Sequence, residues 1–134
     1  ASWVYTTQLY RQANANSANQ LDILNCFAGN LLTARALSSF ANTTSGVFGG
    51  LGIDIDTLNT TSVSNNINFL QYSFTGSTVG PLTTSGVNSF YTGYPGMGRH
   101  TAIWKEISGA TGTTTWFGNA AGFFQSGITG EVNN

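Results

Sequence analysis

Alternation of apolar and polar residues dominates the second half of the chain and predicts β-strands there. Residues 66–74 are rich in aromatic and β-branched side chains and end at a Thr-Gly turn signal. Across residues 101–107 the alternation is strict, so Ala102, Trp104 and Glu106 share one face of the expected strand. Side chains of these types pack well on a pleated surface, so both segments are expected to lie in a β-sheet.

Two further strands are expected towards the end of the chain, at residues 113–117 and 123–132. The glycine-rich segment 108–112 is typical of a hairpin loop. Such a loop would place Trp104 and Trp116 on neighbouring strands, where they would form a cross-strand pair in the core.

The first half of the chain fits either of two patterns. Apolar residues between positions 20 and 40 recur every three to four residues, as on one face of a helix. However, Gly29 and Asn30 interrupt this pattern and form a turn signal, which divides the segment into strands near 21–28 and 31–37. We favour the two strands, because the remainder of the chain is β-like.

A glycine-rich link over residues 45–52 leads into an alternation of isoleucine and aspartate at positions 53–56. As a strand, this segment places its isoleucines inward and Asp54 and Asp56 on one polar face. Two carboxylates on one face could begin a calcium site or an acid–base pair. No further carboxylates follow nearby, so we expect a polar strand face and no metal.

Short strands separated by Gly, Asn and Ser predict an all-β protein, an antiparallel β-sandwich of the jelly-roll kind. The 134 residues suffice for one core, and no linker or repeat divides them, so we expect a single β domain over residues 1–134. Residues 1–19 are polar and rich in Asn and Ala, and are expected to form an N-terminal arm or a connection to a preceding shaft. Trp3 would anchor the first strand.

Composition excludes several function classes. Charged residues make up 7% of the chain, with four Lys and Arg, five Asp and Glu and a net charge of −1. Nucleic-acid binding and polybasic membrane binding both need clustered cations, so neither is expected. No apolar stretch approaches the roughly 20 residues of a transmembrane helix, so membrane insertion is not expected either.

The residues that could carry catalysis or bind metal are few. Cys26 cannot form an internal disulfide, and its apolar neighbours predict a small buried side chain. His100 is the one histidine, and no Gly-x-Ser-x-Gly motif accompanies it, so a Ser–His–Asp hydrolase has little support. One His and one Cys cannot fill a tetrahedral zinc site. We therefore expect a structural or interface histidine, no cofactor and no enzymatic activity.

The segment 88–104 is the best candidate for ligand binding, because it combines aromatic residues with glycines that let the backbone turn. Exposed aromatic rings offer flat faces to sugars or partner side chains, and an arginine supplies oriented donors. From this segment, Tyr91, Tyr94, Arg99 and Trp104 are predicted to face a ligand. The alternative is a loop packed on its own aromatic residues or buried between subunits.

The last third of the chain contains four short blocks of residues: Gly98-Arg99-His100-Thr101, Trp104-Lys105-Glu106, Gly112-Thr113-Thr114-Thr115-Trp116-Phe117-Gly118 and Gln125-Ser126-Gly127-Ile128-Thr129-Gly130. Together they resemble the distal β-structured head domains of viral and bacteriophage fibres and related trimeric adhesins. The resemblance covers about the last forty residues by block and the rest by composition. No binding residues carry over from it, because such heads vary most at their binding loops.

The resemblance implies a homotrimeric head on a virion surface or outside the cell that attaches to a host-surface glycan or protein receptor. A trimer also tolerates a low charge content, because it buries aromatic, Thr and Asn surface between subunits. Other functions stay open: a structural β-sandwich subunit of a capsid or pilus, a free-standing lectin, and an enzyme such as a polysaccharide depolymerase.

Overall fold

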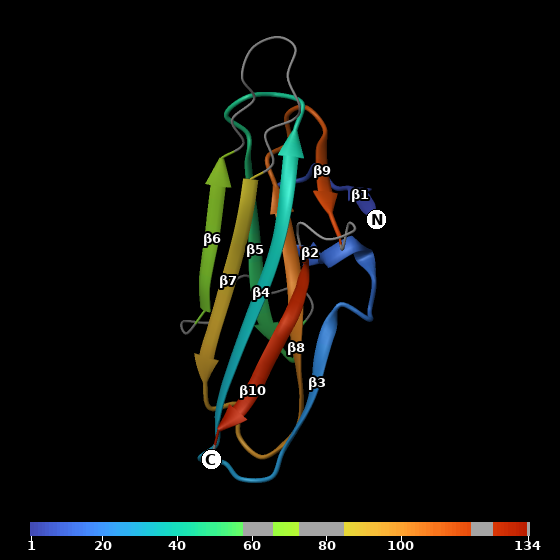
Figure 1. Ribbon diagram of the computed structural model, residues 1–134. Helices are drawn as coiled ribbons and strands as arrows, with labels where there is room; N and C mark the ends of the chain where they lie inside the picture. The colour runs from blue at the N-terminus through green and yellow to red at the C-terminus, as the bar shows by residue number, and fades with distance from the viewer. Residues whose placement is uncertain (58–65, 73–84, 119–124, 134) are drawn as a thin grey trace.

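The computed structural model describes residues 1–57, 66–72, 85–118 and 125–133, and these residues form the all-β fold that the sequence predicts (Figure 1). The strands are β1 (Ser2–Val4), β2 (Arg11–Gln12), β3 (Gln20–Asn25), β4 (Leu31–Asn42), β5 (Phe48–Ile55), β6 (Asn66–Tyr72), β7 (Ser85–Gly93), β8 (Gly98–Ser108), β9 (Thr114–Phe117) and β10 (Gly127–Asn133). One 3₁₀ turn, η1 (Ala13–Ala15), follows β2. Within the described residues, no helix is long and apolar enough to cross a membrane.

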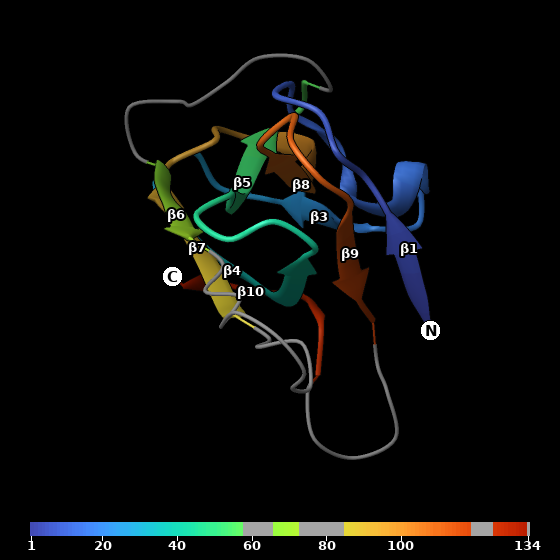
Figure 2. The ribbon, with the colours of Figure 1, turned by 90° about the horizontal axis from the view of Figure 1, so that it is seen from above.

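Two antiparallel sheets pack face to face, as in a β-sandwich (Figure 2). In sheet A, β4 pairs with β7 on one side and, on the other, with β9 along one half of its length and β10 along the other half; β1 pairs with β9. In sheet B, β8 pairs with β5 on one side and with β2 and β3 on the other. Strand β6 pairs with β7 through residues 66–68 and with β5 through residues 69–72, so it joins the two sheets along one edge.

The strands expected in the first half of the chain are confirmed, and so is the turn between them. The Asn30 backbone N–H donates to the Phe27 carbonyl at 3.1 Å. The turn does not close a hairpin, however, because β3 pairs with β8 in sheet B whereas β4 pairs with β7 in sheet A. The turn therefore carries the chain from one sheet to the other.

The hairpin predicted over residues 108–112 is wrong for the same reason, since β8 lies in sheet B and β9 in sheet A. Trp104 lies opposite Ile53, and Trp116 lies opposite Phe40, so the two tryptophans are not a cross-strand pair. Both side chains are nevertheless buried inside the sandwich. Gly109 marks the crossing, where its N–H donates to the Phe48 carbonyl at 2.9 Å.

The core lies between the sheets and is made of alternate side chains from each strand. Two aromatic contacts dominate it: Phe40 against Trp116 at 5.3 Å and Trp3 edge-on to Trp104 at 6.2 Å between ring centroids. The remaining buried members are Ala13, Leu32, Ala34, Ala36, Leu51, Ile53, Val87, Tyr91 and Ala102. Aromatic rings that meet edge-on or offset add to the free energy gained by burial itself.

The glycine-rich link expected over residues 45–52 is shorter than predicted, because β5 begins at Phe48. A Cβ atom on Gly49 would lie 2.7 Å from the Phe40 ring. The glycine thus makes room for an aromatic ring across the sandwich, which a flexible link would not require. The alternation that follows places Ile53 inward, as expected.

Residues 1–19 supply one short strand to each sheet, β1 to sheet A and β2 to sheet B. Trp3 lies opposite Trp116 in the register of β1 and β9, which agrees with its predicted anchoring role, and Ala13 is fully buried. The buried position predicted for Cys26 is wrong, because β3 ends at Asn25 and the cysteine side chain is exposed in the turn. Strands β6 and β10 confirm two further predictions, although positions 73–74 and 123–124 lie outside the described residues.

Candidate functional site

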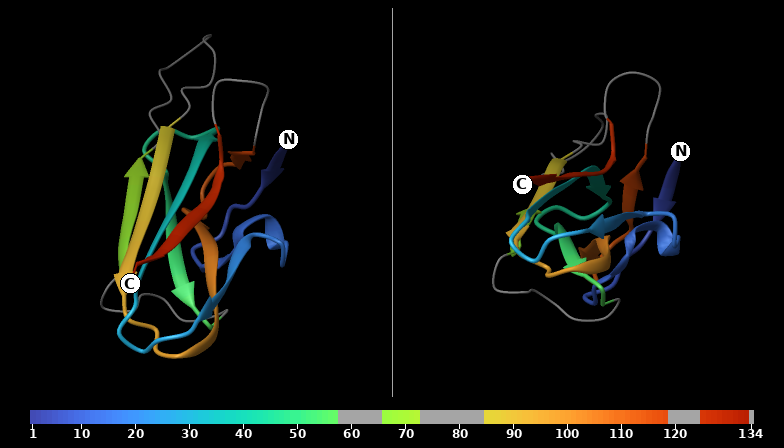
Figure 3. Two further views of the ribbon diagram at one scale, coloured as in Figure 1. Left: turned by 60° about the horizontal axis from the view of Figure 1, so that its bottom comes forward. Right: turned by 90° about the horizontal axis from the view of Figure 1, so that it is seen from below.

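Strands β10, β4 and β7 run side by side in sheet A (Figure 3). A shallow groove lies over the outer face of these three strands. The strand register sets outward-facing side chains in three rows across the sheet. The rows are Glu131, Thr33 and Thr92; then Thr129, Arg35 and Phe90; then Gly127, Leu37 and Asn88. The strand register alone therefore places polar, charged and aromatic side chains next to one another on one face of the sheet.

The groove has a volume of about 480 Å³ and is lined by the first two rows. A second hollow of about 270 Å³ adjoins it, beside Leu37, Gln125, Ser126 and Gly127. Arg35 and Thr129 line both hollows. The absence of a side chain at Gly127 opens this second space, since a Cβ there would meet nothing within 4 Å among the described atoms.

Arg35 and Phe90 form the centre of the groove. The guanidinium carbon lies 5.1 Å from the centroid of the Phe90 ring, within range of a cation–π contact. The Phe90 side chain remains 38% exposed. Beside this pair, the Thr33 hydroxyl donates to Glu131 at 3.5 Å. An aromatic face edged by hydroxyls, a carboxylate and a guanidinium can hold a polar ligand with an apolar side, as a sugar ring is.

The structure does not bring the four predicted ligand-facing residues together. Tyr91 and Trp104 are 6% and 3% exposed, so their rings belong to the core, although Tyr91 also contributes to the floor of the groove. Tyr94 is exposed in the loop after β7, and Arg99 is exposed on the outer face of sheet B, where it pairs with Asp22 at 3.3 Å.

Phe90 lies within the segment that the sequence singles out, but adjacent aromatic residues at 90 and 91 hide which ring faces outward. Arg35 lies outside that segment. The alternation of Thr33, Arg35 and Leu37 along β4 is the signal that could have pointed to it.

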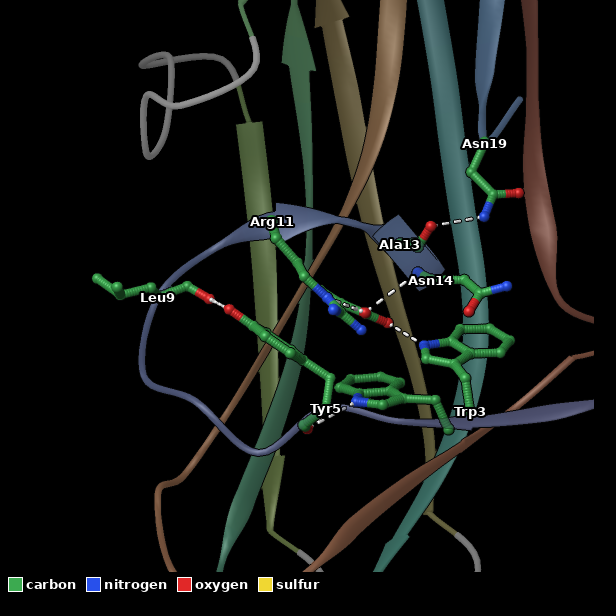
Figure 4. Close-up of polar contacts among 9 residues, drawn as sticks. Trp3, Tyr5, Leu9, Arg11, Ala13, Asn14 and Asn19 are labelled. Atoms are coloured by element: carbon green, nitrogen blue, oxygen red, sulfur yellow. Dashed lines mark hydrogen bonds and ion pairs between the residues drawn. The ribbon is translucent and has the colours of Figure 1, made fainter. Parts of the chain in front are cut away.

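A second polar cluster surrounds the fully buried carboxylate of Glu106. Figure 4 labels its three donors, Trp3, Arg11 and Asn14. Trp3 Nε1 donates to Oε2 at 2.6 Å, while Arg11 Nε and the Asn14 backbone N–H donate to Oε1 at 2.8 and 3.1 Å. Burial raises the pKa of Glu106, and the hydrogen bonds from Trp3 and Arg11 oppose that rise. With both oxygens engaged inside the protein, this carboxylate fastens the N-terminal segment to β8.

Lys105, the neighbour of Glu106 on β8, points to the other face of sheet B and forms a buried ion pair with Asp54. Its ammonium group also lies 5.5 Å from the centroid of the Tyr10 ring. Burial raises the pKa of Asp54, and the contact with Lys105 opposes it. This pair is closed to solvent and joins β5 to β8.

Asp56 joins the end of β5 to the beginning of β8. Its Oδ2 lies 2.7 Å from His100 Nδ1, and its Oδ1 accepts the Thr101 backbone N–H at 2.7 Å. Partial burial would raise the pKa of Asp56, but the hydrogen bonds from His100 and Thr101 bring it below its ordinary value. His100 Nε2 is buried and has no hydrogen-bond partner among the described residues.

Asp54 and Asp56 therefore serve different partners and do not share a cation. Across the described ranges, no group of three His, Cys, Asp or Glu side chains gathers as a metal site would require.

Exposed apolar side chains lie at one end of the sandwich, at the end of β3 and on the loops that follow β3 and β7. We call this set the apolar tip; its members, between 66% and 74% exposed, are Leu24, Phe27, Tyr94 and Met97. The Asn25 amide donates to the Gly96 carbonyl at 2.5 Å and ties the two loops together. An exposed apolar cluster of this kind suits contact with another protein.

No family model matches this chain, and neither the curated proteins nor the solved structures contain a significant match to it.

Proposed function

We propose that this chain is a non-enzymatic attachment head, of the kind carried by viral and phage fibres, and that it binds a cell-surface glycan in the groove on sheet A. The observation that carries the proposal is the exposed Phe90 ring beside Arg35, in a hollow edged by the hydroxyls of Thr33, Thr92 and Thr129. Sugar rings stack their C–H faces on aromatic rings and satisfy their hydroxyls with side-chain donors and acceptors.

The binding role is also supported by how the acidic residues are used. Asp54, Asp56 and Glu106 are each engaged with a cation, a histidine or several donors inside the fold. A glycosidase needs two carboxylates flanking one bond, about 5–9.5 Å apart. Among the described residues Glu131 is the one carboxylate that lines the groove, which favours holding a saccharide over cleaving it.

Low charge and the resemblance of the last third of the chain support an attachment head on a virion or another extracellular fibre, assembled as a homotrimer. The assembly is testable by light scattering on a sizing column. A mass near three chains is expected for the trimeric head. A single-chain mass would contradict the trimer and leave a monomeric lectin.

Glycan binding is tested with an immobilised panel of neutral and acidic oligosaccharides. Phe90→Ala is expected to weaken the wild-type signal at least about tenfold, because a stacked ring is lost from the centre of the groove. Tyr94→Ala is the matched control, since it removes an exposed aromatic side chain from the apolar tip. Loss with Tyr94→Ala alone would instead support the loop site predicted from the sequence, and no wild-type binding to any glycan would refute the proposal.

A structural subunit of a larger assembly is the second candidate, and the apolar tip favours it. Under this hypothesis Leu24→Ser combined with Met97→Ser lowers the assembled mass. Leu9→Ser is the control, because Leu9 is 69% exposed and lies outside the tip. Unchanged assembly in the double variant would count against a structural role for the tip.

A further inference from the structure

Nine side chains of the chain carry a formal charge, and two of them differ from the other seven in having no ion pair with a described residue. All nine lie within the described residues, and seven of them have a partner of opposite charge or, for Asp56, the histidine. These contacts are Arg11 with Glu106, Arg99 with Asp22, Lys105 with Asp54 and Asp56 with His100. Arg35 and Glu131 form no ion pair with the described part of the chain, and both line the groove.

Arg35 is placed to bind a carboxylate. A planar guanidinium over an aromatic ring keeps its N–H groups in its own plane, where they can form two parallel hydrogen bonds to a carboxylate. The cation–π contact with Phe90 restrains the side chain before any ligand arrives. Less side-chain entropy is then lost when the ligand binds.

Glu131 forms no ion pair with Arg35 within the described part of the chain, and its carboxylate accepts a hydrogen bond from the Thr33 hydroxyl at 3.5 Å instead. The two residues lie on neighbouring strands, two positions apart in register, which separates their backbones by roughly 8 Å for strands about 4.8 Å apart with a rise of about 3.3 Å per residue. One sugar ring fits over this span. Its acidic group would meet Arg35, while its hydroxyls would meet Glu131 and Thr33.

We infer that the groove selects saccharides that carry a carboxylate, which Arg35 binds through its guanidinium while Phe90 stacks against the ring. This inference rests on the proposed function and adds the class of ligand. A single cation next to an acidic side chain suits one carboxylate better than a densely sulfated chain or a phosphate cluster, since those require several cations together. The net charge of −1 also disfavours a ligand that carries many negative charges.

The test measures binding of trigalacturonate and sialyl-lactose, each compared with its own methyl ester, by titration calorimetry. The ester keeps the sugar and removes the negative charge. Wild type is expected to bind at least one of the free acids about tenfold more tightly than its ester. Arg35→Gln should abolish this preference, and Arg35→Lys should retain only part of it. Glu131→Gln should strengthen binding of the acid.

Arg99→Gln is the matched control, because it makes the same change of charge at an exposed arginine on the opposite sheet. Loss of the preference with Arg99→Gln but not with Arg35→Gln would overturn the inference. Equal binding of acid and ester, or binding only to neutral glycans on the panel, would also overturn it while leaving glycan binding intact. Failure to bind every glycan would refute the proposed function itself. Circular dichroism and thermal unfolding confirm that each variant is folded.

Discussion

On β8, Lys105 and Glu106 are buried, and each meets a counter-charge supplied by a neighbouring strand. On the outer face of sheet A, Arg35 and Glu131 are exposed and lie on neighbouring strands without pairing. A chain with so few charges thus uses them in two ways. Those on β8 hold segments of the fold together, whereas those in the groove remain available to a ligand.

The largest loss of stability is expected when the buried carboxylate of Glu106 is removed. Glu106→Ala leaves Trp3 Nε1, the Arg11 guanidinium and the Asn14 N–H without their acceptor inside the protein. We expect the free energy of unfolding to fall by about 3–5 kcal/mol, measured by urea denaturation. Glu131→Ala, at the exposed site, should change it by about 0.5 kcal/mol or less. Similar losses in the two variants would contradict the distinction.

The Lys105–Asp54 pair allows a test in which a second substitution is expected to recover the stability that the first one loses. Lys105→Met alone leaves the Asp54 carboxylate buried without this counter-charge and should destabilise the protein by about 3 kcal/mol in urea denaturation. Adding Asp54→Leu should recover most of that loss, because two apolar groups of similar size replace the pair. Arg35→Met should have little effect. A double variant that is less stable than Lys105→Met would show that the pair contributes more than it costs to bury.

Two glycines show a similar difference between the core and the groove, in the space that is free for a side chain. Gly49→Ala places a methyl group against the Phe40 ring, where a Cβ would lie at 2.7 Å, so we expect a loss of about 1–3 kcal/mol in thermal or urea unfolding. A methyl group at Gly127 meets no described atom within 4 Å, so Gly127→Ala should be near neutral for stability. A larger side chain at Gly127 should then block the second hollow without unfolding the protein. Comparable destabilisation by the two alanines would contradict this assignment.

The Asp56–His100 contact is partly buried, between the buried pairs on β8 and the exposed charges of the groove. Its contribution to the free energy of unfolding can be measured through its dependence on pH. The pKa of Asp56 is lower in the folded state than its ordinary value, so the contact stabilises the fold fully above about pH 5 and progressively less as the carboxyl is protonated at lower pH. The stability difference between wild type and Asp56→Asn should therefore shrink as the pH falls from about 5 to about 2. A difference that does not change with pH would contradict the assigned direction.

The strands were predictable because alternation is a local property. The alternation over residues 101–107 correctly placed Trp104 and Glu106 on one face, and the turn at Gly29 was visible. The partner of each strand was not visible, because turns at 29–30 and 108–112 have the composition of hairpin loops but connect different sheets. Which strand pairs with β8 depends on contacts made across the whole chain.

The groove could not be predicted for a similar reason. Arg35, Phe90 and Thr129 become neighbours only through the register of three strands that are distant in sequence. Within the segment 88–104, aromatic residues occupy both faces of β7. The sequence alone therefore favoured Tyr91, which is buried, over Phe90, which is exposed.

The placement of the basic residues has a consequence for proteolysis. Arg11 lies in β2, Arg35 in β4, and Arg99 and Lys105 in β8, so every lysine and arginine of the chain is held in a strand. Trypsin binds its substrate as an extended, unpaired segment, which these strands can supply only by opening. The rate of tryptic cleavage should therefore follow the opening of the sheets, and the folded domain should persist where such proteases are abundant.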